Sequence, residues 1–200
     1  MMYNMKKSFF LILLLASSGS YAGGSVWEKS YQLAAAGKYE QAAEVIEPVA
    51  DAGNEYAVLR YAYLMYMQGE NADAISYYKK AIDLNPDSID ARLGITLPLI
   101  AQKRWRQVKS YSLQVLRMSR WNYTAHLRLM VAEEGMRKWD ALAEHAVKLA
   151  KVYPSDASAL VYLARARAWQ GDIAAAKAAY REVLIRLPAH IEANNYLKNN

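Results

Sequence analysis

Cysteine is absent from all 200 residues of the chain. A disulfide framework, a thiolate metal site and a cysteine nucleophile are therefore excluded together. The absence also excludes the lipid-modified cysteine that follows the cleavage site of a bacterial lipoprotein. Secreted eukaryotic domains usually carry disulfides, so an exported protein of this composition is better suited to a bacterial compartment.

Catalytic motifs are also missing. The chain has no HExxH, no G-x-S-x-G, no phosphate-binding glycine loop and no Rossmann fingerprint. His126, His145 and His190 do not have metal-ligand spacing, and we interpret His126 as a hydrogen-bonded helix residue. Glu133 and Glu134 are sequence neighbours, so they point in different directions on a helix and cannot form a facing acid pair. We therefore expect no enzyme, no cofactor and no metal site.

Long apolar runs are limited to one segment near the N-terminus. Lys6 and Lys7 precede the apolar residues 9–16, and Ser20-Tyr21-Ala22 has the small residues of a signal-peptidase site. The run is shorter than the roughly 20 residues of a membrane-spanning helix. The pattern predicts a signal peptide over residues 1–22, cleaved near Ala22, and a periplasmic or secreted mature protein. An uncleaved anchor is the alternative.

Acidic side chains are scarce in one segment of the chain. The formal net charge is +6, and loss of Lys6 and Lys7 with the signal leaves +6 − 2 = +4. Residues 89–122 hold seven basic side chains against Asp90 alone. Four of these are expected near one helix face, which could contact anionic lipid or polysaccharide: Arg106, Lys109, Arg117 and Arg120. A solvated charged face is the alternative, and nucleic acid is not an expected partner because stacking aromatics are not organised along this face.

A period of 34 residues runs through the chain, as in Pro154 and Pro188. Gly69 and Gly171 are three periods apart. Each period has two apolar stripes of helical spacing separated by a short turn, and no segment alternates like a strand. Small or apolar residues repeat at one position of the second stripe: Ala42, Ala74, Val108, Leu142 and Ala176. The pattern predicts an all-α protein whose repeats stack on their neighbours.

Residues 55–88 resemble the tetratricopeptide repeat (TPR) family in their turn glycine, small packing residues, aromatic residue and proline. Residues 157–190 match almost as well. Lys103 and Arg137 stand at the turn glycine in two other units, and Arg120 replaces a proline. The resemblance implies a right-handed superhelical solenoid of about five helix-turn-helix units, at residues 23–54, 55–88, 89–122, 123–156 and 157–190. Residues 191–200 would form a short capping helix, in which Ile191 and Leu197 cover the fifth unit.

The fourth unit departs from the small facing residues of the second and fifth. Met130 and Leu142 stand where Ala62 faces Ala74 in the second unit. Two large side chains must separate the helices or reshape their neighbours, since overpacking costs about 1–3 kcal/mol. We predict a local change in superhelix curvature at the fourth unit.

The first helix of each TPR unit lines a concave groove, and the resemblance places the groove positions of this chain. They are aromatic and aliphatic in the N-terminal and central units and charged near the C-terminus: Trp27, Tyr31, Tyr56, Leu59, Tyr63, Tyr66, Leu93, Leu97, Ile100, Leu127, Val131, Glu134, Arg165 and Trp169. This composition suits an amphipathic helix or an extended apolar segment of another protein. Tyr78 and Tyr180 are expected in the core.

Charged residues interrupt the C-terminal half of the groove. Glu133 and Arg167 are one period apart, and we predict an ion pair between adjacent repeats. Glu134 and Arg165 would join them in a polar cluster. A polar anchor for a ligand at this end of the groove is the alternative.

These features predict a periplasmic scaffold that binds a partner protein in an apolar, tyrosine-rich groove, as an assembly factor for an envelope complex. One alternative is an envelope-surface binder that uses the basic face on anionic lipid or polysaccharide. Another is a self-assembling array, in which a second copy of the chain is the partner.

Overall fold

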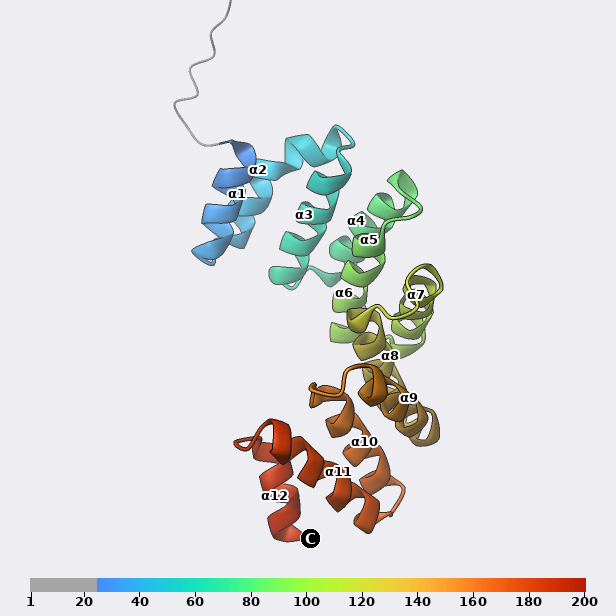
Figure 1. Cartoon of the computed structure of the whole chain (residues 1–200). Coiled ribbons are helices and arrows are strands. Elements are labelled where there is room, and N and C mark those ends of the chain that lie inside the picture. The colour runs from blue at the N-terminus through green and yellow to red at the C-terminus, as the bar shows by residue number, and fades with distance from the viewer. Residues whose placement is uncertain (1–24) are drawn as a thin grey trace, which may run out of the picture.

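The computed structural model describes residues 25–200, which form pairs of antiparallel α-helices (Figure 1). The predicted signal peptide lies outside the described residues. The first helices of the pairs are α1 (Val26–Ala35), α3 (Glu55–Met67), α5 (Ile89–Gly94) with α6 (Thr96–Ala101), α8 (Tyr123–Gly135) and α10 (Ser158–Trp169). The second helices are α2 (Tyr39–Asp51), α4 (Asn71–Leu84), α7 (Trp105–Met118), α9 (Trp139–Val152) and α11 (Ile173–Arg186), and α12 (Ile191–Asn199) follows them. Residues 25–200 contain no strand.

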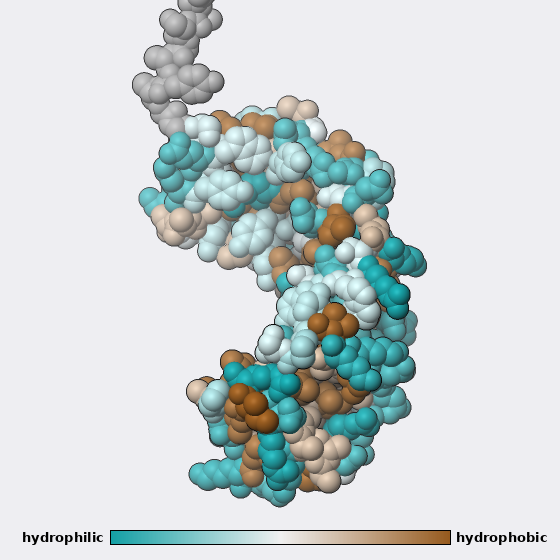
Figure 2. Space-filling view, in the orientation of Figure 1, coloured by the Kyte–Doolittle hydropathy of each residue, from teal (hydrophilic) through white to brown (hydrophobic). Residues whose placement is uncertain are grey.

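The helix pairs stack one on the next instead of packing around a single centre. Each helix contacts mainly its neighbours in sequence, and the arc runs from α1 at its blue end to α12 at its red end (Figure 1). Buried apolar side chains form a series of clusters along the arc, each built from neighbouring helices. Figure 2 shows that one side of the arc is hollowed between the N-terminal helices and α10–α12. The predicted all-α superhelical solenoid is confirmed.

Three of the first helices, α3, α5 and α8, begin at a capping residue that recurs with the 34-residue period. The side chains of Asn54, Ser88 and Asn122 each accept a hydrogen bond from the backbone N–H three residues later, at 3.1, 3.3 and 2.9 Å. His190 does the same for α12, at 3.2 Å. Such caps satisfy one of the backbone donors that a helix N-terminus leaves without a partner. The period therefore fixes the start of each of these helices.

The turns inside the pairs require a left-handed backbone. Gly37, Gly69 and Gly171 adopt φ of 73°, 87° and 81° at the end of the first helix. Lys103 and Arg137 occupy the same turn position with φ of 55° and 57°. The two substitutions noted in the sequence therefore preserve the turn, at the steric cost that a Cβ atom carries in this conformation.

Glycine at these two positions is expected to stabilise the protein. Lys103→Gly and Arg137→Gly should each raise the free energy of unfolding by about 0.5–1 kcal/mol, since left-handed strain of about 1–2 kcal/mol exceeds the entropy that glycine adds to the unfolded chain. Urea denaturation followed by circular dichroism measures the change. Gly69→Ala is the matched control, because nothing lies within 4 Å of the added Cβ and only the backbone strain changes, so stability should fall. A loss of stability in Lys103→Gly would contradict the expectation.

Pro98 breaks the first helix of the third pair, which the sequence interpretation did not anticipate. Proline lacks an N–H group, and its ring clashes with the carbonyl four residues earlier, here that of Gly94. α5 ends at Gly94 and α6 begins at Thr96. The buried hydroxyl of Thr96 donates to the carbonyl of Leu93 at this break.

The helices of the fourth pair are more widely spaced than those of the second and fifth pairs. Met130 on α8 and Leu142 on α9 are fully buried in one cluster. The backbones of α8 and α9 approach each other less closely than those of α3 and α4 or of α10 and α11. Of the two outcomes expected for these side chains, the structure shows separation of the helices, while the change in superhelix curvature stays a prediction.

The terminal helix covers the fifth pair with different residues from those expected. Leu197 packs on the last cluster as predicted, together with the half-buried Tyr196 and the fully buried Ala193. Ile191 is 76% exposed, so its predicted covering role is wrong. α12 begins at Ile191, and the phase set by Ala193 and Leu197 leaves this first residue off the packed face.

Candidate functional site

Five predicted groove residues meet in one pocket near the N-terminal end of the arc. This N-terminal groove pocket has a volume of about 320 Å³ and lies among α1, α3, α4 and α5. Its lining comprises Trp27, Tyr31, Tyr56, Leu59, Arg60, Tyr63, Tyr78, Asp90 and Gly94. Of the predicted residues, Trp27, Tyr31, Tyr56, Leu59 and Tyr63 are brought together here.

Three of its tyrosines present large ring surfaces to solvent. Tyr56 is 70% exposed, Tyr31 57% and Tyr63 37%. Tyr66 is half-buried, with its ring centroid 6.5 Å from that of Tyr63. Exposed aromatic rings around a shared pocket form a contiguous surface of the kind that binds partners.

The floor of this pocket depends on a glycine. Tyr78 is 3% exposed, which confirms its core position, yet it also lines the pocket. A Cβ atom on Gly94 would lie 2.2 Å from Cε1 of Tyr78. Because a rigid ring cannot yield by that amount, only glycine at this position lets the ring lie under the groove.

The central residues of the predicted groove lie outside both pockets. Leu93, Leu97, Ile100, Leu127 and Val131 are half-buried, and none of them lines the pocket at either end. Ile100 and Leu127 pack partly against the core clusters of their own regions. These residues give an apolar stretch between the two pockets.

The C-terminal end holds a larger pocket, here the C-terminal groove pocket. It has a volume of about 1070 Å³ and includes the predicted residues Glu134, Arg165 and Trp169. Trp169 is 66% exposed and stacks on Trp139 with ring centroids 5.3 Å apart. Half of the remaining lining residues lie on α12, for which the sequence predicted only a capping role.

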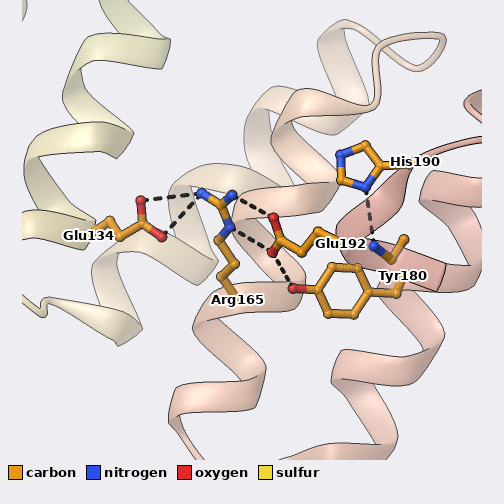
Figure 3. Close-up of polar contacts among 6 residues, drawn as sticks. Glu134, Arg165, Tyr180, His190 and Glu192 are labelled. Carbon is orange, nitrogen blue, oxygen red and sulfur yellow. Dashed lines mark hydrogen bonds and ion pairs between the residues drawn. The ribbon is translucent and has the colours of Figure 1, made fainter. Parts of the chain in front are cut away.

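Arg165 is held between two carboxylates in this pocket. Its Nε and Nη2 donate to the two oxygens of Glu192 at 2.8 and 2.6 Å, and Nη1 lies 3.4 Å from Oε1 of Glu134. Tyr180 is in the core, as predicted, and its hydroxyl donates to Glu192 at 2.6 Å. Figure 3 shows Arg165 between Glu134 and Glu192, with Tyr180 beside Glu192. Of the four residues predicted to form a polar cluster, Glu134 and Arg165 meet here, whereas Glu133 and Arg167 do not join them.

The hydrogen bonds of this cluster shift the pKa values of its members. Donation by Arg165 lowers the pKa of Glu192, and acceptance by Glu192 raises the pKa of Arg165. Burial raises the pKa of Tyr180, so its hydroxyl remains a donor to Glu192. The cluster is therefore a charged, hydrogen-bonded unit that fixes α12 to α10 and α11.

The predicted ion pair between Glu133 and Arg167 is wrong. Arg167 donates to the side chain of Gln170 at 3.1 Å. Glu133 turns toward the second helix of its own pair, where Oε2 lies 3.2 Å from Nδ1 of His145. That imidazole offers a partner inside the same repeat, so the buried carboxylate does not need a cation from the next repeat.

This contact belongs to a His126–His145–Glu133 network between α8 and α9. Nε2 of His145 lies 2.6 Å from Nδ1 of His126, and Nε2 of His126 lies 3.0 Å from the carbonyl oxygen of Arg120. His126 is thus a hydrogen-bonded helix residue, as interpreted. Its partner was missed because His145 lies 19 residues away on another helix.

Each contact of the network needs one hydrogen, which assigns the tautomers. The carbonyl of Arg120 can only accept, so Nε2 of His126 donates to it. A neutral His126 then accepts at Nδ1 from Nε2 of His145. The remaining contact needs a proton shared between His145 and Glu133, either as an imidazolium and a carboxylate or as an imidazole and a carboxylic acid.

The predicted basic face is only partly on one helix. Arg106, Lys109 and Arg117 lie on α7, but α7 ends at Met118, so Arg120 is in the following turn and its helical placement is wrong. Arg106, Arg117 and Arg120 are exposed, and Lys109 is half-buried. None of the four forms an ion pair with another of the described residues.

Residues 25–200 contain neither a metal-binding cluster nor a membrane-spanning helix. No three His, Asp or Glu side chains in this range are grouped to hold a metal ion. None of its helices has both the length and the apolar character needed to cross a membrane.

Models of the tetratricopeptide repeat family match residues 29–89 and 158–189. No curated protein matches the chain significantly. Among solved structures, MamA from Desulfovibrio magneticus RS-1 is 15% identical, with a TM-score of 0.75 over 83% of this chain and 95% of MamA. YrrB, a TPR protein with an unusual peptide-binding site, is 12% identical, with a TM-score of 0.72 over 86% of this chain and 90% of YrrB. PilW, a type IV pilus biogenesis factor, is 18% identical, with a TM-score of 0.72 over 87% of this chain and 85% of PilW.

Proposed function

We propose that this tetratricopeptide repeat protein is a scaffold that binds a segment of another protein in its concave groove. The observation that carries the proposal is the N-terminal groove pocket, where Tyr31, Tyr56 and Tyr63 expose their rings beside one another. The half-buried aliphatic residues of the central groove extend this surface toward α10. The proposed role is binding, without catalysis.

The stacked helices would favour binding by holding the groove in shape before a partner arrives. The groove residues of α3 and α8 project from helices that begin at a side-chain cap and end at a tight turn. A preorganised surface loses little conformational entropy on binding, so more of the contact free energy appears as affinity. An amphipathic helix or an extended apolar segment is the class of ligand that fits an aromatic and aliphatic groove.

The proposal sets this scaffold in the bacterial envelope, as an assembly factor. Its support is the basic and apolar segment at residues 6–16, followed by Ser20-Tyr21-Ala22 and the absence of cysteine. The likeness to PilW, a pilus biogenesis factor, and to YrrB, a protein with a peptide-binding site, agrees with an assembly role.

Substitutions in the groove test the proposal. A Tyr63→Ala, Leu97→Asp variant should lose at least about nine-tenths of the partner captured from a native periplasmic extract, because it removes an aromatic ring and places a charge in the apolar stretch. Quantitative mass spectrometry of the captured proteins measures the loss. Leu113→Asp on α7, where Leu113 is 37% exposed and outside the groove, is the control. Undiminished capture by the groove variant would refute the proposal.

The same capture separates the alternative surfaces. Binding by the basic residues of α7 should weaken steeply as salt is added, whereas binding in an apolar groove should not. Light scattering at several protein concentrations reports whether the chain assembles with itself. Salt-resistant capture that depends on Tyr63 and Leu97 supports the groove.

A further inference from the structure

The two groove pockets occupy equivalent positions in two different repeats. Tyr78 and Tyr180 are 102 residues apart, which is three periods, and so are Asp90 and Glu192. In each case the tyrosine lies under the groove on a second helix, and the acid lies in the first turn of the next helix. In each pocket, both the tyrosine and the acid are lining residues. The intervening repeats have Ser112 and Ala146 in place of the tyrosine.

The C-terminal groove pocket shows what a tyrosine and an acid in this arrangement bind. Arg165 makes two short hydrogen bonds to Glu192, and its Cζ lies 5.5 Å from the centroid of the Tyr162 ring. Tyr180 donates to the same carboxylate. A guanidinium between an acid and aromatic rings is stabilised by paired charge-assisted hydrogen bonds and by the negative face of the rings.

The N-terminal groove pocket has the acid and the tyrosine but no equivalent guanidinium. Tyr63 stands three periods before Arg165, so the chain supplies a ring there instead of a cation. Asp90 is exposed and forms no ion pair with any of residues 25–200. A carboxylate beside several tyrosine rings is thus left without the partner that Glu192 has.

Arg60 is the one basic residue in this lining, and it is engaged elsewhere. Its Nη2 donates to the carbonyl of Ser30 at 3.0 Å, and its Nε lies 3.3 Å from the hydroxyl of Ser30. Its Cζ lies 3.9 Å from the centroid of the Tyr31 ring. Arg60 therefore does not pair with Asp90, and its stacking shows that a ring of this pocket can hold a guanidinium.

We propose that the N-terminal groove pocket receives an arginine side chain of the partner segment, which pairs with Asp90 and stacks on the surrounding tyrosines. This inference rests on the proposed groove function and adds the chemistry of one partner residue. The partner's guanidinium takes the position that Arg165 occupies in the fifth repeat. The segment is then basic at this point and apolar where it crosses Leu97 and Val131.

Nuclear magnetic resonance with a small probe tests the pocket without knowledge of the partner. Nα-acetyl-arginine methylamide, titrated into the full chain, should shift the Trp27 indole and Gly94 amide signals to saturation. The neutral isostere Nα-acetyl-citrulline methylamide should shift them much less. Asp90→Asn should weaken binding of the arginine probe about fivefold, the size expected for loss of an exposed ion pair.

Two further variants sharpen the test. Tyr63→Arg should abolish probe binding, because it gives the second repeat the internal arginine of the fifth. Asp83→Asn, an exposed acid of α4 outside the pocket, should bind like the parent. No saturable shift, equal binding of the two probes, tighter binding of Nα-acetyl-glutamate methylamide, or an unchanged affinity in Asp90→Asn would each overturn the inference.

Partner capture distinguishes failure of this inference from failure of the groove proposal. Loss of capture in both Asp90→Asn and the Tyr63→Ala, Leu97→Asp variant supports both. Capture that depends on Tyr63 and Leu97 but is unchanged in Asp90→Asn overturns the arginine inference and leaves the groove proposal standing.

Discussion

Leu142→Ala is expected to lower the free energy of unfolding by about 3 kcal/mol, within the range of buried leucine truncations. Leu142 is fully buried, in one cluster with the equally buried Met130. The wider spacing of α8 and α9 matches the space that these two side chains fill. Removing one of them leaves a cavity that the helices can close only by sliding, and both helices also pack on neighbouring pairs.

Thermal unfolding of the full chain measures this cost. A loss of about 3 kcal/mol corresponds to a fall in Tm of about 6–12 °C for a chain of this size. Leu113→Ala on α7 is the control, since Leu113 is 37% exposed and its truncation should cost much less. A cost below about 1 kcal/mol for Leu142→Ala would mean that α8 and α9 can adopt the closer approach of the alanine-faced pairs.

Glu133→Ala is expected to lower the free energy of unfolding by about 3 kcal/mol, since removal of one partner of a buried pair leaves the other without compensation. Glu133 is 5% exposed and pairs with His145, which in turn contacts His126. Without the carboxylate, Nδ1 of His145 loses its partner in a largely buried site. Urea denaturation at pH 7.5 measures the cost, and Glu144→Ala on the exposed face of α9 is the control.

Acid should weaken the same network in the parent protein. Burial is the main cause that lowers the pKa of His126 below its ordinary value of 6.5, and the charge of His145 lowers it further. The hydrogen bond to the carbonyl of Arg120 and the charge of Glu133 oppose this shift. The unfolded chain therefore binds a proton at His126 at a higher pH than the folded protein does. This contribution to stability is complete above about pH 6.5 and is lost as the pH falls through the folded pKa.

Denaturation curves between pH 7.5 and pH 5 separate this effect from general acid sensitivity. His126→Leu removes the imidazole and should reduce the loss of stability at acid pH. His190→Asn keeps a capping side chain on α12 and should leave that loss unchanged. The same acid loss in the parent and in His126→Leu would show that other groups dominate. An unchanged stability at pH 7.5 in Glu133→Ala would show that the network contributes nothing to stability.

Local features of the sequence were sufficient for most of the fold. Lys103 and Arg137 could be assigned to the turn because the turn position recurs every 34 residues, and both adopt its left-handed φ. Met130 and Leu142 could be assigned to one interface because the facing positions are known from the alanine pairs. Pro98 was the exception, because the repeat pattern predicts one first helix in this unit, whereas the structure divides it into α5 and α6.

The candidate site was predicted less completely. The exposed rings of Tyr31, Tyr56 and Tyr63 follow from their positions on the first helices, and the structure places all three at one pocket. The contribution of α12 to the other pocket did not follow from its short, asparagine-rich sequence. Asp90 was interpreted only as the single acid of a basic segment. Its separation from Tyr78 in the sequence nevertheless equals that of Glu192 from Tyr180.

The sequence alone determined the repeat, the helix pairs, the turn positions and the aromatic character of the groove, because each depends on spacing within a few helical turns or on the 34-residue period. The tertiary structure decided which charged and polar side chains meet. Glu133 pairs with His145 and not with Arg167, and Glu192 reaches back to Arg165. Successive residues point about 100° apart around a helix, so the partner of a polar side chain depends on the rotation and spacing of two helices, which the period does not specify.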